Sequence, residues 1–309
     1  MAKKIKDLNM LLSEIGEFGL IDQIKKDVRL SSHVIEGIGD DTAVVKGTKT
    51  KYVLLTTDMM IEDRHFTLEM DPELIGRKAL ACNLSDIAAM GGRPRYALVS
   101  VGITDKIATD VVKKIYKGLR AIASGFKVDV VGGDTVFSEK MVINVALYGD
   151  VKKECLVTRH GARPGDFVFV TGPLGNSFDS GHHLSFIPRL KEADYLVKNF
   201  KPTAMIDISD GLAADLGHIL KASGVGANLY ESEIPLRQGT KTDDALLDGE
   251  DFELLFTLSP GTEKKLSKKK RLPYAFYLIG EITKKPGELN LIDFFGRPKP
   301  IEMKGFSHF

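Results

Sequence analysis

Seven aspartates in short motifs rich in Gly, Ser or Thr constrain this chain more than any other feature. They are spread over about 170 residues, so one local loop cannot hold them all. If the fold brings several together, their mutual repulsion requires divalent cations, and hard oxygen ligands favour Mg²⁺, which commonly accompanies a phosphate substrate. The pattern therefore predicts a Mg²⁺-dependent enzyme that acts on phosphates. The aspartates are Asp40, Asp41, Asp58, Asp86, Asp134, Asp207 and Asp210.

Composition narrows the class of protein. A chain of 309 residues with 43% hydrophobic and 28% charged residues is typical of a globular protein with two domains. A net charge of +1 gives no strong electrostatic attraction to nucleic acid or anionic membranes. Cys82 and Cys155 form no metal-ligand or disulfide pattern. The N-terminus is charged, and no apolar run approaches the roughly 18 residues of a membrane span. We expect a cytoplasmic protein without nucleic-acid or membrane partners.

Hydrophobic periodicity predicts two successive units of helices and strands. Strands come in clusters rather than in strict βαβ alternation, which favours an α+β or mixed α/β fold over a doubly wound sheet. The pattern restarts near residue 151, so we expect an N-terminal domain over 1–150 and a C-terminal domain over 151–309. Helices are expected over 7–27, 72–90, 108–124, 211–223 and about 261–269. Strands are expected over 42–46, 52–57, 95–103, 127–131, 141–150, 167–171, 204–208, 226–230, 251–258 and 274–282.

The aspartate motifs of the first half differ in how well a purely structural role explains them. Asp40-Asp41 follows two glycines and suits a turn as well as a ligand pair. Asp58 follows a threonine pair at the end of an apolar strand, where β-propensity alone explains the threonines. Asp86 lies in a helix of apolar and small residues, where an unpaired buried carboxylate costs several kcal/mol. An exposed helix face is the alternative, but we favour a metal ligand.

The remaining motifs also allow two interpretations. Gly132-Gly133-Asp134-Thr135 follows the strand predicted over 127–131, so it forms a plain turn or lets backbone N–H groups approach an anion. Asp207-Ile208-Ser209-Asp210 leads into the helix from 211; Ser209 or Asp210 can cap that helix, and a helix N-terminus also favours phosphate. His65 and Glu250, taken alone, are more simply structural.

The order of these motifs along the chain resembles the thiamine-monophosphate kinase family. The matching stretches are GIGDDTAVV, TTDMMIEDRHF, KALACNLSDIAAMGG, GGDT, TRHGARPGDFVFVTGPLG, IDISDGLAADLGHIL and GEDFELLFT, which extend from about residue 36 toward the C-terminal KGFSHF. The resemblance implies a two-domain aminoimidazole ribonucleotide synthetase-like fold. Its N-terminal domain would bind ATP and Mg²⁺ and form a homodimer, and its C-terminal domain would complete the cleft. The chain has no G-x-x-x-x-G-K-[ST] motif, as this resemblance implies.

The resemblance also implies a role for particular residues. Several Mg²⁺ ions would be bound by Asp41, Thr56, Thr57, Asp58, Asp86, Asp134, Asp207 and Asp210. ATP would be contacted by Gly133, Asp134, Arg159 and Ser209. Thiamine phosphate would be contacted by His65, Glu250 and Met303, the last at the place where the family commonly has a Trp that this chain lacks, with Phe306 nearby. Asp40 is then left as a turn-former, and the stretch 176–186 departs from the family's small-residue pattern.

The activity implied is direct transfer of the γ-phosphoryl group of ATP to thiamine monophosphate, which gives thiamine diphosphate and ADP. The acceptor oxygen is already ionised near neutral pH because the second pKa of a phosphate is about 6. No nucleophile or general base is therefore assigned, and the aspartates act as ligands. Two alternatives stay open. A superfamily relative that activates selenium would need a reactive cysteine in a Gly-rich N-terminal segment, whereas the first cysteine here is Cys82. A nucleotide sensor would be expected to lack some of the acids.

Overall fold

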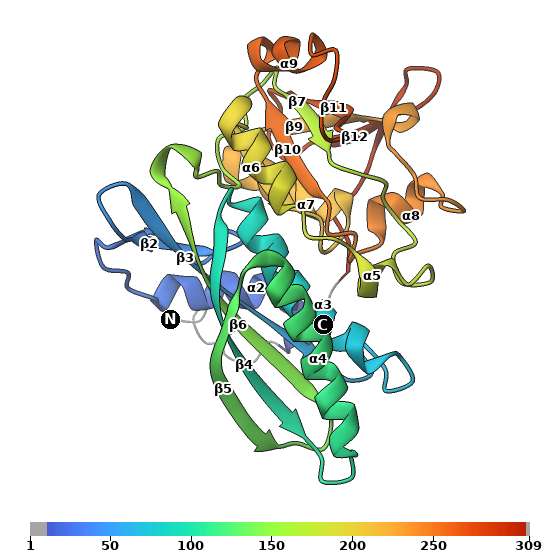
Figure 1. The fold of residues 1–309 in the computed structure, drawn as a ribbon. Coiled ribbons are helices and arrows are strands. Elements are labelled where there is room, and N and C mark those ends of the chain that lie inside the picture. The colour runs from blue at the N-terminus through green and yellow to red at the C-terminus, as the bar shows by residue number, and fades with distance from the viewer. Residues whose placement is uncertain (1–10, 307–309) are drawn as a thin grey trace, which may run out of the picture.

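The first domain is a six-stranded sheet with helices on one face (Figure 1). The computed structural model describes residues 11–306. The strand order is β1-β2-β3-β6-β4-β5, antiparallel throughout except for the parallel pair β4–β5. The strands are β1 Val34–Glu36, β2 Ala43–Lys46, β3 Lys51–Ile61, β4 Arg93–Ile103, β5 Asp129–Phe137 and β6 Val142–Lys152. The helices are α2 Leu12–Asp27, α3 Pro72–Ala89 and α4 Thr109–Phe126.

The two faces of this sheet have different environments. Along β3, Leu54 and Met60 are buried on the side of α3, whereas Leu55 and Met59 are about half exposed on the other side. Successive strand residues point to opposite faces, so this alternation assigns every residue of β3 to a face. We call the face that α3 covers the helix face, and the opposite one, which carries Leu55 and Met59, the open face. Leu98 of β4 is also exposed on the open face.

Two long stretches of sheet edge, besides the short edge strand β1, have no strand beside them within residues 11–306. β5 is the last strand of the sheet, and all but one of its nine residues are exposed. β2 pairs with β3 only from Tyr52 to Leu55. The outer edge of β3 beyond Leu55 therefore has no strand beside it in this part of the chain. Unpaired edges of this kind are places where another chain can add its strands.

The second domain is a seven-stranded mixed sheet with the order β13-β12-β9-β11-β7-β10-β8. Its centre is apolar, and all five residues of β10 are buried. The strands are β7 Phe167–Val170, β8 Ala204–Asp207, β9 Gly226–Tyr230, β10 Leu254–Leu258, β11 Tyr277–Thr283, β12 Leu289–Ile292 and β13 Pro298–Pro300. The helices are α5 His182–Ser185, α6 Leu190–Asn199, α7 Leu212–Ser223, α8 Thr242–Leu247 and α9 Pro260–Ser267.

Helix α3 joins the two domains. It begins at Pro72, with the Asp71 side chain accepting a hydrogen bond from the Glu73 N–H, as Pro at the first helical position predicts. It packs against β3, β6 and α4 on one side and against β8, α5 and α6 on the other. One continuous apolar core runs from the first domain through this helix into the second. The helix that carries Asp86 is therefore buried between the domains.

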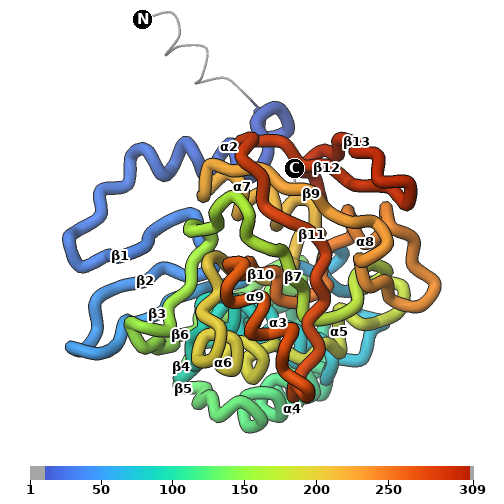
Figure 2. The backbone as a smooth tube through the Cα atoms, turned by 90° about the horizontal axis from the view of Figure 1, so that it is seen from above, coloured from blue at the N-terminus to red at the C-terminus, as the bar shows by residue number. Residues whose placement is uncertain are grey.

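Helix α2 lies beside α7, although the two are far apart in the sequence (Figure 2). The Phe18 ring lies 4.5 Å from the His218 ring, and Lys221 forms an ion pair with Asp22 at 3.1 Å. The first residues of the helix predicted over 7–27 lie outside the described residues. Across residues 11–306 no helix is both long and apolar enough to span a membrane.

One prediction of local structure was wrong. The strand predicted over 127–131 runs instead from Asp129 to Phe137, so Gly132-Gly133-Asp134-Thr135 lies inside β5 and not in a turn after it. The strand can continue through residue 133 because that residue is a glycine. Its φ is +157°, and a Cβ there would lie 1.7 Å from the Val99 carbonyl oxygen of β4. Helix α6, Leu190–Asn199, was not predicted.

Candidate functional site

Three aspartates from distant parts of the chain meet between the domains. Asp41, Asp86 and Asp207 each offer a carboxylate oxygen, and these oxygens lie within 4.8 Å of one another. Asp41 follows the glycine turn before β2, Asp86 lies in the last turns of α3, and Asp207 ends β8. Thr56 of β3 donates a 2.5 Å hydrogen bond to Asp86 Oδ2, and Asp58, two residues further on, shares its face of the sheet. We call Asp41, Asp58, Asp86 and Asp207 the acid cluster.

The acid cluster carries more negative charge than its surroundings compensate. Burial raises the pKa of Asp58 to about 6 and that of Asp207 to about 8, with further upward contributions from the charge of Asp41. Burial and the neighbouring carboxylates raise the pKa of Asp86 well above its usual range. Within residues 11–306, one oxygen each of Asp41, Asp58 and Asp207 is buried without a hydrogen-bond partner. Unpartnered, converging carboxylate oxygens are the donor set that hard divalent cations take, so these residues fit Mg²⁺.

Arg159 is a cation that contacts this cluster. Its Nη2 lies 2.6 Å from Asp41 Oδ1, and the Asp41 side chain is only 1% exposed. This ion pair lowers the pKa of Asp41, but burial outweighs it, so the pKa of Asp41 is still raised. The sequence resemblance assigned Arg159 to ATP, and the structure places its guanidinium at the acid cluster.

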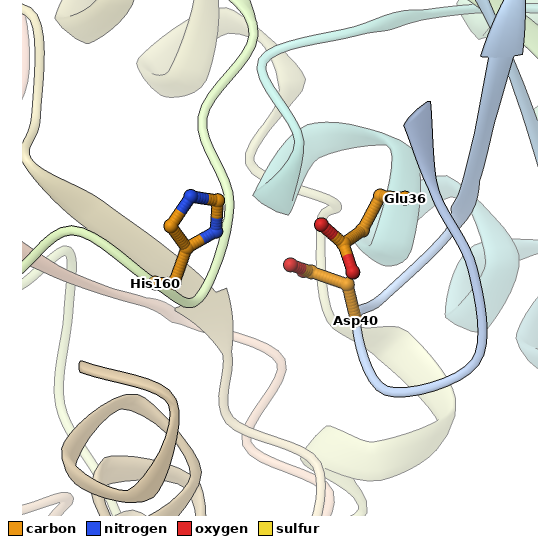
Figure 3. Close-up of side chains that lie close together, drawn as sticks. All are labelled: Glu36, Asp40 and His160. Atoms are coloured by element: carbon orange, nitrogen blue, oxygen red, sulfur yellow. The ribbon is translucent and has the colours of Figure 1, made fainter. Parts of the chain in front are cut away.

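Asp40 belongs to a neighbouring group at the seam between the two domains (Figure 3). Glu36 and Asp40 come from the first domain, and His160 faces them from the segment before β7. Asp40 accepts hydrogen bonds from the N–H groups of Asp41 and Arg159, both at 3.0 Å. These contacts hold the glycine turn against the segment that carries Arg159. Asp40 therefore positions its neighbours, which extends the turn-forming role predicted for it.

Two residues assigned to the metal by resemblance lie on the open face. Thr57 is exposed there and donates to Asn144 Oδ1 at 3.1 Å. Asp134 pairs with Ser100, Ser100 with Asn144, and Asn144 with Met59, so Asp134 shares the face of Met59. These paired residues lie on four neighbouring strands, so Asp134 and Met59 are three strand spacings, or about 14 Å, apart. Within one chain, Asp134 therefore lies away from the acid cluster and on the opposite side of the sheet.

The loop between β8 and α7 brings Ser209 and Asp210 beside the cluster. The N–H groups of Asp210 and Gly211 both donate to Asp215 Oδ2, at 3.0 and 3.1 Å. Asp215, in the first turn of α7, therefore fixes the backbone before this helix, whose N-cap residue is Gly211. Asp210, Asp215 and His218 form a second group of possible ligands within 4.8 Å. Sequence reasoning missed His218, whose only signal is its spacing of three residues from Asp215 on one helix.

A cavity of about 490 Å³ adjoins this loop and contains two of the residues assigned to thiamine phosphate. It is lined by His65, Glu250 and Phe306, among others. The Glu250 N–H donates to Ser209 O at 2.7 Å, and the Phe306 N–H donates to Asp210 O at 2.9 Å. We call this cavity the ring pocket. Two of its lining residues, Glu250 and Phe306, contact the loop that follows Asp207 of the acid cluster.

Lys78 supports the ring pocket and was missed from the sequence. Its side chain is 1% exposed, and its Nζ lies 2.6 Å from Glu250 Oε1 and 2.9 Å from the His65 carbonyl oxygen. His65 Nδ1 accepts the Ile61 N–H at 3.0 Å, so a neutral ring carries its proton on Nε2. The signal for Lys78 was available, because it is a charged residue in the same apolar helix as Asp86, eight positions earlier.

Met303 lies away from the pocket lining. It packs against Gly217 of α7, where a Cβ would lie 2.9 Å from the Met303 Cβ. Phe306 lines the ring pocket instead. Of the two residues that the resemblance brought into question, Phe306 and not Met303 lines this cavity.

Comparisons with known proteins agree with this architecture. Residues 39–151 match the family of the AIR synthase related protein, N-terminal domain, and residues 177–291 match that of the AIR synthase related protein, C-terminal domain. The hydrogenase maturation protein HypE in complex with ATP is 19% identical with a TM-score of 0.68 over 98% of this chain and 95% of that chain, a similarity of fold alone. The chain thus consists of two AIR synthase related domains.

More similar relatives define the family within this class. Thiamine-monophosphate kinase of Aquifex aeolicus is 36% identical over 97% of this chain and all of the relative. The Bacillus subtilis thiamine-monophosphate kinase is 34% identical over 96% of this chain and all of the relative. A solved structure of AaThiL complexed with AMPPCP and TMP superposes with a TM-score of 0.85 at 35% identity, covering 97% of this chain and 99% of that one. The chain belongs to the thiamine-monophosphate kinase family.

Proposed function

We propose that this chain is a kinase that transfers the γ-phosphoryl group of ATP to thiamine monophosphate, giving thiamine diphosphate and ADP. The observation that carries this function is the full-length match to thiamine-monophosphate kinases, together with an acid cluster placed beside a ring-sized pocket. Phosphate oxygens belong at the acid cluster, and the organic part of the acceptor belongs in the ring pocket. Ser209 and Asp210 connect the two through their bonds to Glu250 and Phe306.

Asp41, Asp58, Asp86 and Asp207 would hold the Mg²⁺ ions, with Thr56 orienting Asp86. Bound there, Mg²⁺ supplies electrostatic stabilisation of the charge that develops on the transferring phosphoryl group. The support for this assignment is the set of buried oxygens without hydrogen-bond partners and the raised pKa values of the carboxyls. We extend the same role to Asp210, which lies in the loop between β8 and α7.

The chain's own residues then bind and orient the two substrates. Arg159, which contacts Asp41 here, is placed to pair with a phosphate oxygen of ATP when cations neutralise the cluster. His65 and Glu250 position the acceptor in the ring pocket. Burial raises the pKa of the Cys82 thiol, which disfavours the nucleophilic thiolate form. Orientation of ionised phosphates provides most of the rate enhancement, without a phosphoenzyme.

A homodimer would cover the open face. Its exposed apolar side chains include Leu55, Met59 and Leu98, and such patches mark protein interfaces. We expect the two protomers to contact each other along the unpaired outer edges of β5 and of β3 beyond Leu55. A two-fold arrangement that places β5 of one protomer along the β3 edge of its partner closes the sheets and pairs both edges.

That arrangement gives Thr57 and Asp134 a role in the site. Strand β5 of one protomer would lie next to residues 56–61 of its partner, so its Asp134 would approach Thr57, the neighbour of Asp58 in the chain, across the interface. Asp134 would then bind metal, and Gly133 and Asp134 would contact ATP, in trans. The supporting observation is that Thr57 and Asp134 share the open face while their separation within one chain is three strand spacings.

We assign the enzyme to the cytoplasm, where ATP is available. The free thiols of Cys82 and Cys155 are consistent with a reducing compartment.

ADP release with and without thiamine monophosphate, in the presence of MgCl₂ and ATP, tests the function. We expect ADP release to depend on thiamine monophosphate and on Mg²⁺. Binding of ATP by calorimetry without thiamine-phosphate-dependent ADP release would identify a nucleotide sensor instead. Every aspartate of the acid cluster is present, which favours the enzyme. Labelled protein after incubation with γ-labelled ATP alone would contradict direct transfer.

A further inference from the structure

Phe178 is an aromatic side chain at the ring pocket that the established motifs do not explain. It lies on the loop between β7 and α5, lines the ring pocket, and is 53% exposed. Its ring stacks on the His183 ring, with centroids 4.5 Å apart and an interplanar angle of 16°. One face of the Phe178 ring is therefore covered by His183, and the exposed remainder is available to a flat ligand.

His183 holds Phe178 in this position. The His183 side chain is buried, and its Nδ1 lies 3.1 Å from the Ser177 carbonyl oxygen. A carbonyl oxygen only accepts, so Nδ1 carries the proton. Burial and the nearby Lys78 ammonium lower the pKa of His183, so the ring is neutral at physiological pH. A neutral ring behind Phe178 adds no positive charge that would oppose a cation stacked on its other face.

The charges that line the ring pocket favour a cationic ligand. Asp179, Asp248 and Glu250 line it, against the single cation Arg64 among its lining residues. Lys78 offsets Glu250 through their ion pair. Asp248 Oδ2 accepts the Asn176 N–H at 3.0 Å, so this carboxylate is fixed at the same loop that carries Phe178. The lining remains net negative next to an exposed aromatic face.

We propose that Phe178, with Asp179 beside it, selects the positively charged thiazolium ring of the acceptor by cation–π stacking. The proposal rests on the proposed function and deepens it. Phe178 is a specificity-determining residue: it binds the acceptor ring and takes no part in phosphoryl transfer. The chemistry recognised is a flat aromatic cation that carries a phosphate, as distinct from a neutral ring of the same shape.

Steady-state kinetics with two acceptors test the proposal: thiamine monophosphate, and deazathiamine monophosphate, in which carbon replaces the charged ring nitrogen. We expect Phe178→Leu to raise the KM for thiamine monophosphate about tenfold. The KM for the neutral analogue, the KM for ATP and kcat should stay within about twofold. Phe178→Tyr, which keeps the aromatic face, should restore the wild-type KM. Phe294→Leu, at an exposed phenylalanine outside the ring pocket, is the matched control.

Two results would overturn the proposal. An unchanged KM for thiamine monophosphate in Phe178→Leu would show that Phe178 does not bind the acceptor ring. An equal loss for both acceptors would reduce Phe178 to an apolar contact without charge selection. Failure of the proposed function has a separate signature, because wild-type protein would then release no ADP in response to thiamine monophosphate.

Discussion

Strand β3 contributes residues to both faces of the six-stranded sheet, and the two faces have different environments. On the helix face, Thr56 and Asp58 meet Asp86 in a buried, charge-rich centre that one chain assembles by itself. On the open face, Thr57 is exposed among apolar side chains, and Asp134 lies on the same side three strands away. Adjacent residues of one motif therefore serve opposite sides of the sheet. The acids of the helix face lie together within one chain, whereas Asp134 on the open face lies away from them.

The largest effect is expected from removing a charge at the centre of the helix face. Asp86→Asn should lower kcat by at least about 10³-fold, because the site loses a ligand for the cations that stabilise transferring phosphoryl. ADP release measures this loss. Asp150→Asn is the matched control, since Asp150 pairs with Lys51 and Arg95 at the far end of the same sheet. Near-normal turnover in Asp86→Asn would remove the metal assignment.

Next in size is a charge placed on the open face. Leu98→Arg should convert the dimer to a monomer, because it buries an unpaired cation in the apolar contact. We expect light scattering to give the mass of one chain and activity to fall by more than about tenfold. Phe295→Arg, at a phenylalanine that is 83% exposed in the second domain, should leave mass and activity unchanged. A monomeric wild-type protein would contradict the dimer at once.

A smaller effect is expected at the ring pocket, which depends on the helix face through Lys78. Lys78→Met should raise the KM for thiamine monophosphate about tenfold and destabilise the fold, since Glu250 is left without its ammonium partner. The KM for ATP should change little. Lys117→Met, which removes the exposed pair with Glu73, is the control. Equal increases in both KM values would show that Lys78 supports the whole cleft and not the pocket alone.

The smallest effect concerns pH and stability. Folding raises the pKa of Asp207 from 3.8 to about 8 and that of Asp58 to about 6, so the folded protein binds more protons than the unfolded one between these values. Stability without metal is therefore highest at low pH in this window and falls as pH rises through it. We expect Tm to decrease by a few degrees between pH 5 and pH 8, and MgCl₂ to reverse the decrease.

The control for this pH profile is Asp207→Asn. This variant should flatten the slope of Tm against pH without metal, because the carboxyl whose pKa changes on folding is gone. A Tm that rises with pH in the metal-free wild type would mean that the acid cluster does not carry the unfavourable charge described for it.

Acids of the helix face that the sequence singled out lie together in the structure, and their role as metal ligands stays a prediction. Asp86 in an apolar helix was the clearer signal, whereas helix capping also offered an explanation for the motif that begins at Asp207. The sequence did not predict the division between faces, because Gly132-Gly133 suggested a turn and the strand in fact continues through it. The alternation of side chains along a strand assigns Asp134 to a face of the sheet only once the bounds of β5 are known.

Residues that depend on packing were the hardest to predict. Lys78 carries the same signal as Asp86, but its partner Glu250 is 172 positions away in the sequence. Position near the C-terminus suggested Met303, whereas only the contact with Gly217 reveals that Met303 packs on α7 and leaves Phe306 to line the pocket. Spacing alone does not determine which side chain of an irregular segment points inward.

Mixed dimers of Asp86→Asn and Asp134→Asn test the difference between the two faces most directly. The two variants, each inactive alone, are co-expressed with different affinity tags, and the mixed dimer is purified through both tags. If Asp134 acts in trans, one of the two sites in the mixed dimer combines intact Asp86 with intact Asp134. The predicted activity is then about half that of the wild-type dimer. Activity no higher than that of either parent would place both residues in one site of the same chain and contradict the account.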